Sequence, residues 1–196
     1  MKKLLLILIL LLSFQTCVRA NDIKDFEIEG MSVESNLLDY AEILNLTKEQ
    51  IKNKKLTFYP KSKRLGVVNF YDGKFEIYDS VQFTIDANNY KIYRISGKIY
   101  NLTKNECVEQ QNYIISILEQ EYPDAIKDVD AFEPHDIDET GESIANGIYL
   151  DFQSGDTFLV ECYIWGKNLK EDGYVDHITV AIETKHGRDF IQNEAY

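Results

Sequence analysis

The pattern of apolar and polar positions predicts short helices followed by strands in the first half of the chain. Apolar side chains recur at helical spacing after Ser32, which we expect to cap a first helix. Thr47 and Gln50 form a capping box at the start of a second, short helix. Aromatic and β-branched runs then predict four strands, with Asp72-Gly73 as a hairpin turn between the first two, at residues 67–71, 74–78, 81–85 and 90–100.

The second half has a similar order of elements. Thr103 and Glu106 form another capping box, which begins a helix that runs to about Tyr122 and is stopped by Pro123. We expect an acidic loop over 124–146, and then strands at 148–152, 157–165 and 175–183 and a final helix at 188–194.

This order, αα-ββββ-α-βββ-α, predicts an α+β fold with a mostly antiparallel sheet. We expect one domain over residues 21–196, in which 21–100 and 101–196 could be two decayed αβ halves.

Cys107 and Cys162 each fall on the apolar side of a predicted element. Strand alternation over 157–165 places Cys162 on the same face as Val160, and helical spacing places Cys107 on the same face as Ile114. Both sulfur atoms therefore face the layer where helix meets sheet. We predict a Cys107–Cys162 disulfide, with two buried free thiols as the alternative.

The opposite face of the last three predicted strands is rich in aromatic and apolar residues. Strand alternation places six side chains there: Tyr149, Leu159, Tyr163, Trp165, Val175 and His177. An apolar outer face needs either a covering layer or a partner. The N-terminal half of the chain could cover it, or it could be a binding face for a protein or a small ligand.

The first 20 residues have the layout of a secretory signal peptide. Lys2 and Lys3 precede an unbroken apolar run over 4–12, and small residues before Asn21 predict cleavage after Ala20. Cys17 raises a lipoprotein alternative, although residues 14–16 lack the small side chains that lipidation requires. The apolar run is shorter than the roughly 20 residues of a membrane span, and no later segment is long enough. We therefore expect a soluble periplasmic or secreted protein.

Composition and charge narrow the class of partner. The chain is 44% hydrophobic and 12% aromatic, which is typical of a folded domain with a substantial core. Its formal net charge of −12 argues against nucleic acid and anionic lipid surfaces, because both require a basic binding face.

Sequence motifs for catalysis, metals or cofactors are weak. The three histidines, His135, His177 and His186, lack metal-ligand spacing, so we predict no zinc site, no cofactor and no catalytic residues. Residues 136–141 match the first half of a calcium loop, but Gly147 occupies the position that needs an acid. Weak cation binding by the acidic loop 124–146 is left as an alternative.

Several short stretches of the mature chain carry a resemblance to other proteins. They are Asp25-Phe26-Glu27-Ile28-Glu29-Gly30-Met31-Ser32 with Leu37-Leu38-Asp39-Tyr40, Ile77-Tyr78-Asp79, Val81-Gln82-Phe83, Ser154-Gly155-Asp156 and Glu161-Cys162. In these stretches the chain resembles short, uncharacterised exported proteins from AT-rich marine alphaproteobacterial genomes. The resemblance implies export and a shared fold, and it supplies no activity or site residues.

The sequence favours an exported protein that binds a protein or small-ligand partner without catalysis. A small periplasmic hydrolase is the alternative, in which carboxylates or His177 would converge only in three dimensions.

Overall fold

The computed structural model describes residue 23 and residues 26–196. The predicted signal peptide over 1–20, its cleavage after Ala20 and the lipidation alternative at Cys17 all lie outside the described residues. None of the helices in the described part of the chain combines the length and the apolar composition needed to cross a bilayer.

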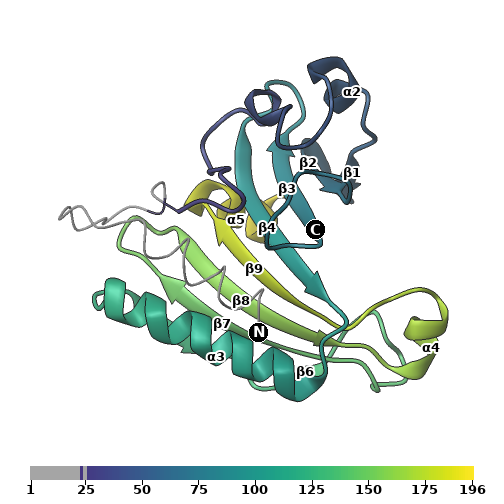
Figure 1. The fold of residues 1–196 in the computed structure, drawn as a ribbon, viewed down its shortest axis with the longest axis vertical. Coiled ribbons are helices and arrows are strands. Elements are labelled where there is room, and N and C mark those ends of the chain that lie inside the picture. Colours follow the sequence, from purple (N-terminus) through teal and green to yellow (C-terminus); the bar gives the residue numbers. More distant parts are fainter. Residues whose placement is uncertain (1–22, 24–25) are drawn as a thin grey trace.

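One continuous antiparallel sheet organises the molecule, which confirms the predicted α+β class (Figure 1). The strand order is β1-β2-β3-β4-β9-β8-β7-β5, and β6 also pairs with β7. The pairing of β4 with β9 joins the strands of the first half to those of the second half. The strands are β1 (Thr57–Tyr59), β2 (Ser62–Phe70), β3 (Ser80–Asp86), β4 (Ile92–Tyr100), β5 (Ile126–Val129), β6 (Glu133–Pro134), β7 (Ile144–Asp151), β8 (Thr157–Ile164) and β9 (His177–Glu183).

Side-chain caps begin most of the helices. The two predicted capping boxes are both present, with Thr47 accepting from the backbone N–H of Gln50 and Thr103 from that of Glu106. The helical elements are the 3₁₀ helix η2 (Leu37–Tyr40) and the α-helices α2 (Lys48–Lys52), α3 (Lys104–Glu121), α4 (Lys167–Glu171) and α5 (Lys185–Asn193).

One face of the sheet carries the main hydrophobic core. Helix α3 packs against β8 and β9 on this face, as the teal helix along the lower strands in Figure 1 shows. Residues 26–56 cover the same face over β1–β4, so Met31 and Leu37 belong to one buried cluster with Phe83 and Val160. We call this the covered face. Residues 26–56 therefore do not cover the aromatic face of the last three strands, contrary to the expectation that the N-terminal half could cover it.

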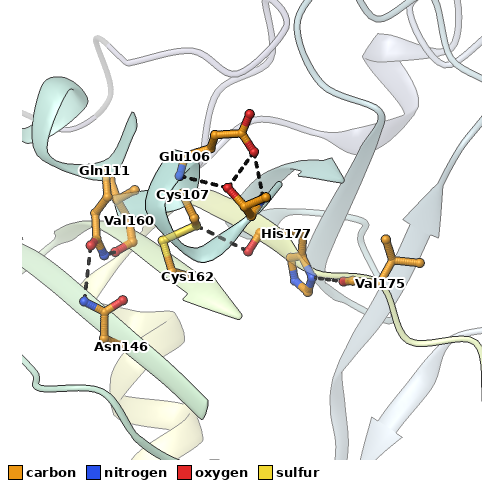
Figure 2. Close-up of a disulfide and its surroundings, with 9 residues drawn as sticks. Glu106, Cys107, Gln111, Asn146, Val160, Cys162, Val175 and His177 are labelled. Carbon is orange, nitrogen blue, oxygen red and sulfur yellow. Dashed lines mark hydrogen bonds between the residues drawn. A yellow bond between two sulfur atoms is a disulfide. The ribbon is translucent and has the colours of Figure 1, made fainter. Parts of the chain in front are cut away.

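The predicted disulfide is present and joins α3 to the centre of the sheet (Figure 2). Cys107 and Cys162 are both fully buried, and their Cα atoms are 5.9 Å apart. Beside them, Gln111 Nε2 donates to the backbone carbonyl of Val160 at 2.7 Å, and Asn146 Nδ2 donates to Gln111 Oε1 at 3.2 Å. The bridge and the amide pair hold α3 on the covered face of β8.

The first predicted helix, starting at Ser32, is wrong. Glu34 has φ of 67°, which an α-helix cannot contain, and only the 3₁₀ turn η2 forms, capped by Asn36. The backbone N–H groups of Glu34 and Leu37 donate instead to carbonyl oxygens of Ile92 and Tyr90. Tertiary hydrogen bonds to the start of β4 thus replace the local helical bonds.

The predicted hairpin through Asp72-Gly73 is also wrong, because residues 74–78 form no strand. The Glu29 carboxylate accepts hydrogen bonds from the backbone N–H groups of Glu76, Ile77 and Tyr78, at 2.7 to 2.9 Å. These donors are therefore not available to a sheet ladder, and β2 pairs with β3, which begins at Ser80.

In the C-terminal half, several observed elements differ in detail from the predicted ones. The region 124–146, predicted as an acidic loop, contains the strands β5 and β6 and the start of β7. The loop before β9 contains α4, and Val175 precedes β9 instead of lying within it. The last helix begins at Lys185 because Thr184 caps it by accepting from the backbone N–H of Gly187.

Candidate functional site

Among the described residues, no helix covers the centre of the sheet face opposite α3, and we call this the open face. Cross-strand register places the predicted binding residues on it, since Tyr149 pairs with Leu159 and Tyr163 pairs with His177. Helix α5 covers one end, where Phe190 packs against Leu65 in a small separate cluster. The central residues of the open face are Arg94, Ser96, Lys98, Tyr100, Gly147, Tyr149, Leu159, Glu161, Tyr163, His177, Thr179, Ala181 and Glu183.

At the end away from α5, aromatic rings pack against one another. Tyr163 lies nearly parallel to both Trp165 and His177, with ring centroids 5.6 and 4.8 Å apart. Tyr174 meets Trp165 edge-on at 5.0 Å, and Tyr100 meets His177 at 5.6 Å. Such pairs each contribute about 0.5–1.5 kcal/mol beyond burial, so the rings form a mutually supported platform.

A hollow of about 490 Å³ opens beside this platform. Trp165 and His177 are 8% and 7% exposed, whereas Tyr71 and Tyr174 are 61% and 42% exposed. This volume lies within the usual range for small-ligand sites. The hollow is lined by Tyr71, Lys98, Tyr100, Trp165, Asp172, Gly173, Tyr174, Val175 and His177, and we call it the aromatic hollow.

The structure brings only some of the predicted face residues to this hollow. Trp165, Val175 and His177 line it, whereas Tyr149, Leu159 and Tyr163 lie outside its lining. Leu159 is only 2% exposed, which makes it a packing residue of the open face.

Sequence reasoning missed six lining residues, which are Tyr71, Lys98, Tyr100, Asp172, Gly173 and Tyr174. Lys98 and Tyr100 could have been found, because Ile95 and Ile99 face the core and the polar positions of β4 alternate with them. Tyr71 and Tyr174 lie in connecting segments, where no periodicity indicates the direction of a side chain.

His177 is neutral at pH 7. Its Nδ1 lies 2.8 Å from the backbone carbonyl of Val175, which can only accept, so we assign the proton to Nδ1 (Figure 2). Burial lowers the pKa of His177 to about 4; the nearby Lys98 cation lowers it further, while the Val175 carbonyl opposes the shift. Among the described residues Nε2 has no hydrogen-bond partner, and it is therefore an unused acceptor.

Arg94 lies in the middle of the open face and binds two carboxylates. Its guanidinium is 3.3 Å from Glu161 and 3.7 Å from Glu183, and Nε donates to Ser96 Oγ at 3.1 Å. Burial raises the pKa of Glu183, while the attraction of Arg94 opposes the shift. The two carboxylates that converge on this face thus serve to neutralise Arg94.

Lys98 differs from Arg94, because within the described residues its ammonium group makes no ion pair or hydrogen bond. Burial lowers the pKa of Lys98, the Arg94 cation lowers it further, and Glu161 opposes both effects. The hollow therefore contains a partly desolvated cation that no carboxylate of the described residues contacts directly, although Asp172 also lines the hollow.

Within the acidic region, the carboxylate of Asp138 is bonded to residues close to it in sequence. Asp138 accepts hydrogen bonds from Thr140 and from both the backbone and the hydroxyl of Ser143, which lowers the pKa of Asp138 to about 2. Across the described residues, no three histidine, cysteine or acidic side chains converge to hold a metal ion.

Comparison with known proteins finds no matching family model, no similar curated protein and no similar solved structure.

Proposed function

We propose that the chain is an exported, non-catalytic binding protein that holds a small ring-bearing ligand in the aromatic hollow. The observation that carries this proposal is the placement of exposed Tyr71 and Tyr174 rings around the buried rings of Trp165 and His177. Rings at the rim of a concave site can pack against both faces of a flat ligand, and they lose apolar contact with water when the ligand binds.

The size of the hollow supports a small ligand in preference to a protein partner. Its volume of about 490 Å³ suits a compact molecule, whereas a stable protein interface buries about 800 Å² on each side. The platform is already ordered by its own ring contacts, so the cost of organising the site on binding is low.

Export is supported by two independent features. The leader over 1–20 has the charge and apolar pattern of a signal peptide. The Cys107–Cys162 disulfide is of the kind that persists in oxidising compartments.

The proposal can be tested with the protein's own fluorescence. The chain has a single tryptophan, Trp165, and it lines the hollow, so selectively excited emission reports on this site alone. We expect phenylacetamide or phenylacetate, titrated into the millimolar range typical of fragments, to change the emission of Trp165 with saturation.

Substitution of a rim residue separates specific binding from nonspecific quenching. Tyr174→Ala should weaken the binding of the probes by about fivefold or more, since it removes one aromatic contact. Tyr196→Ala is the matched control, because Tyr196 is 68% exposed and does not line the hollow. Linear quenching without saturation, or equal loss in both variants, would refute the proposed binding site.

A further inference from the structure

We infer that the ligand of the aromatic hollow is an organic acid, a ring carrying a carboxylate that pairs with Lys98. This inference rests on the proposed function of the same hollow and adds the chemical class of the ligand. It follows from the position of Lys98 in the lining, from the pairing of nearby cations with carboxylates, and from the neutrality of His177.

Lys98 occupies a central position on the open face. Its strand β4 lies between β3 and β9, and register places Lys98 opposite Ser80 on one side and Thr179 on the other. Tyr100 and His177, the next pair along the same face, line the hollow together with Lys98. Lys98 thus lines the same hollow as the aromatic platform, where a ring and an attached acid could be bound together.

In the described part of the chain, the cations near Lys98 are each paired with a carboxylate, whereas Lys98 is not. Arg94 binds Glu161 and Glu183, and Lys170 Nζ lies 2.7 Å from Asp176 Oδ2. Lys98 has no such partner among the described residues. A partly buried charge without a counter-ion is costly to folding, so its presence at a concave site points to a ligand that supplies the opposite charge.

The other titratable groups in and around the hollow do not supply a positive charge that could pair with an acid. His177 is neutral at pH 7 and offers an acceptor at Nε2. Asp172 also lines the hollow, but its side chain is exposed and stays hydrated. Glu161 is already bound to Arg94. The positive charge facing a ligand in the hollow is therefore that of Lys98.

The overall charge of the protein limits how the acid is recognised. With a formal net charge of −12, the chain does not attract anions over long distances. Recognition must come from direct contact with Lys98 at short range, where screening by salt is weakest. A carboxylate attached to an aromatic ring and a carboxylate attached to a sugar ring share this chemistry, because a flat aromatic ring and the C–H face of a sugar can both pack against the platform.

The test compares acids with their neutral counterparts. Phenylacetate and phenylacetamide have nearly the same shape and differ in charge, as do glucuronate and methyl glucoside in the sugar series. Each pair is titrated against the wild type, Lys98→Met and Lys63→Met, with Trp165 emission as the signal. Lys63→Met is the matched control, because exposed Lys63 lies on β2 outside the hollow.

We expect one acid to bind the wild type and Lys63→Met about tenfold to hundredfold more tightly than its neutral counterpart, as a charge-assisted hydrogen bond predicts. In Lys98→Met this preference should vanish while the neutral probe still binds. The series that shows the preference identifies the ring as aromatic or sugar. If Lys98→Met does not fold, Lys98→Gln serves the same comparison.

The outcomes distinguish this inference from the proposed function. Equal binding of acid and neutral probe to the wild type, or a preference retained in Lys98→Met, would overturn the inference and leave the binding site standing. Failure of all four probes to bind the wild type would overturn the proposed function, and the inference with it.

Discussion

Removal of the Cys107–Cys162 disulfide should cost the fold about 4 kcal/mol. The bridge closes a loop with a sequence separation of 55 residues, and the chain-entropy relation assigns this value to a loop of that length. For a domain of this size, the loss corresponds to a fall in Tm of about 8–16 °C. The double variant Cys107→Ala/Cys162→Ala should show this fall.

Urea unfolding, followed by Trp165 emission and by circular dichroism, measures the effect. Reduced wild-type protein provides the matched control, because reduction removes the cross-link and keeps both sulfur atoms in the core. The double variant should lose a further amount of about 1 kcal/mol, since both positions are fully buried and truncation leaves a small void.

Two results would refute this reasoning. A free energy of unfolding that changes by less than about 1 kcal/mol on reduction would show that the cross-link does not constrain the unfolded chain. Thiol labelling of the unfolded, unreduced protein would show that the bridge is absent. The labelling requires a chain without residues 1–20, because Cys17 would otherwise react.

Two further predictions concern single side chains. Glu29→Gln should lower the free energy of unfolding by about 2 kcal/mol in urea titrations, because the carboxylate accepts hydrogen bonds from three backbone N–H groups of residues 76–78. A loss of less than about 0.5 kcal/mol would contradict the role of Glu29 in holding that segment. Because the folded pKa of His177 is about 4, below the unfolded value near 6.5, stability should fall by up to about 3 kcal/mol as pH drops from 6.5 to 4. His177→Gln should flatten this part of a stability–pH curve measured by thermal unfolding, and an unchanged slope would disprove the assignment.

Local signals in the sequence were reliable where the interacting groups lie within a few residues of each other. Both capping boxes formed as predicted, because Thr47 and Thr103 bond to N–H groups three residues later. The alternation in 157–165 correctly placed Cys162 on the covered face and Tyr163 on the open face. These features depend on neighbours within a few residues.

Predictions failed where distant groups compete for the same backbone donors. Tyr90 accepts from the N–H of Leu37, which the predicted helix would have used, and Glu29 accepts from the N–H groups of residues 76–78, which the predicted hairpin would have used. Neither acceptor is marked by any local pattern. Predictions therefore fail in connecting segments whose backbone N–H groups donate to acceptors far away in the chain.

The sequence by itself determined the α+β class, the two faces of the central strands and the pair of cysteines, because alternation and helical spacing are properties of neighbouring residues. Only the tertiary structure decided which aromatic residues line a hollow, since Tyr71 and Tyr174 come from separate connections and join Trp165 and Lys98 in its lining. The same holds for the charges: strand order alone places Arg94 beside two carboxylates and leaves Lys98 without one among the described residues. Compensation of a charge depends on distance in space, which the chain acquires only when β4, β8 and β9 lie side by side.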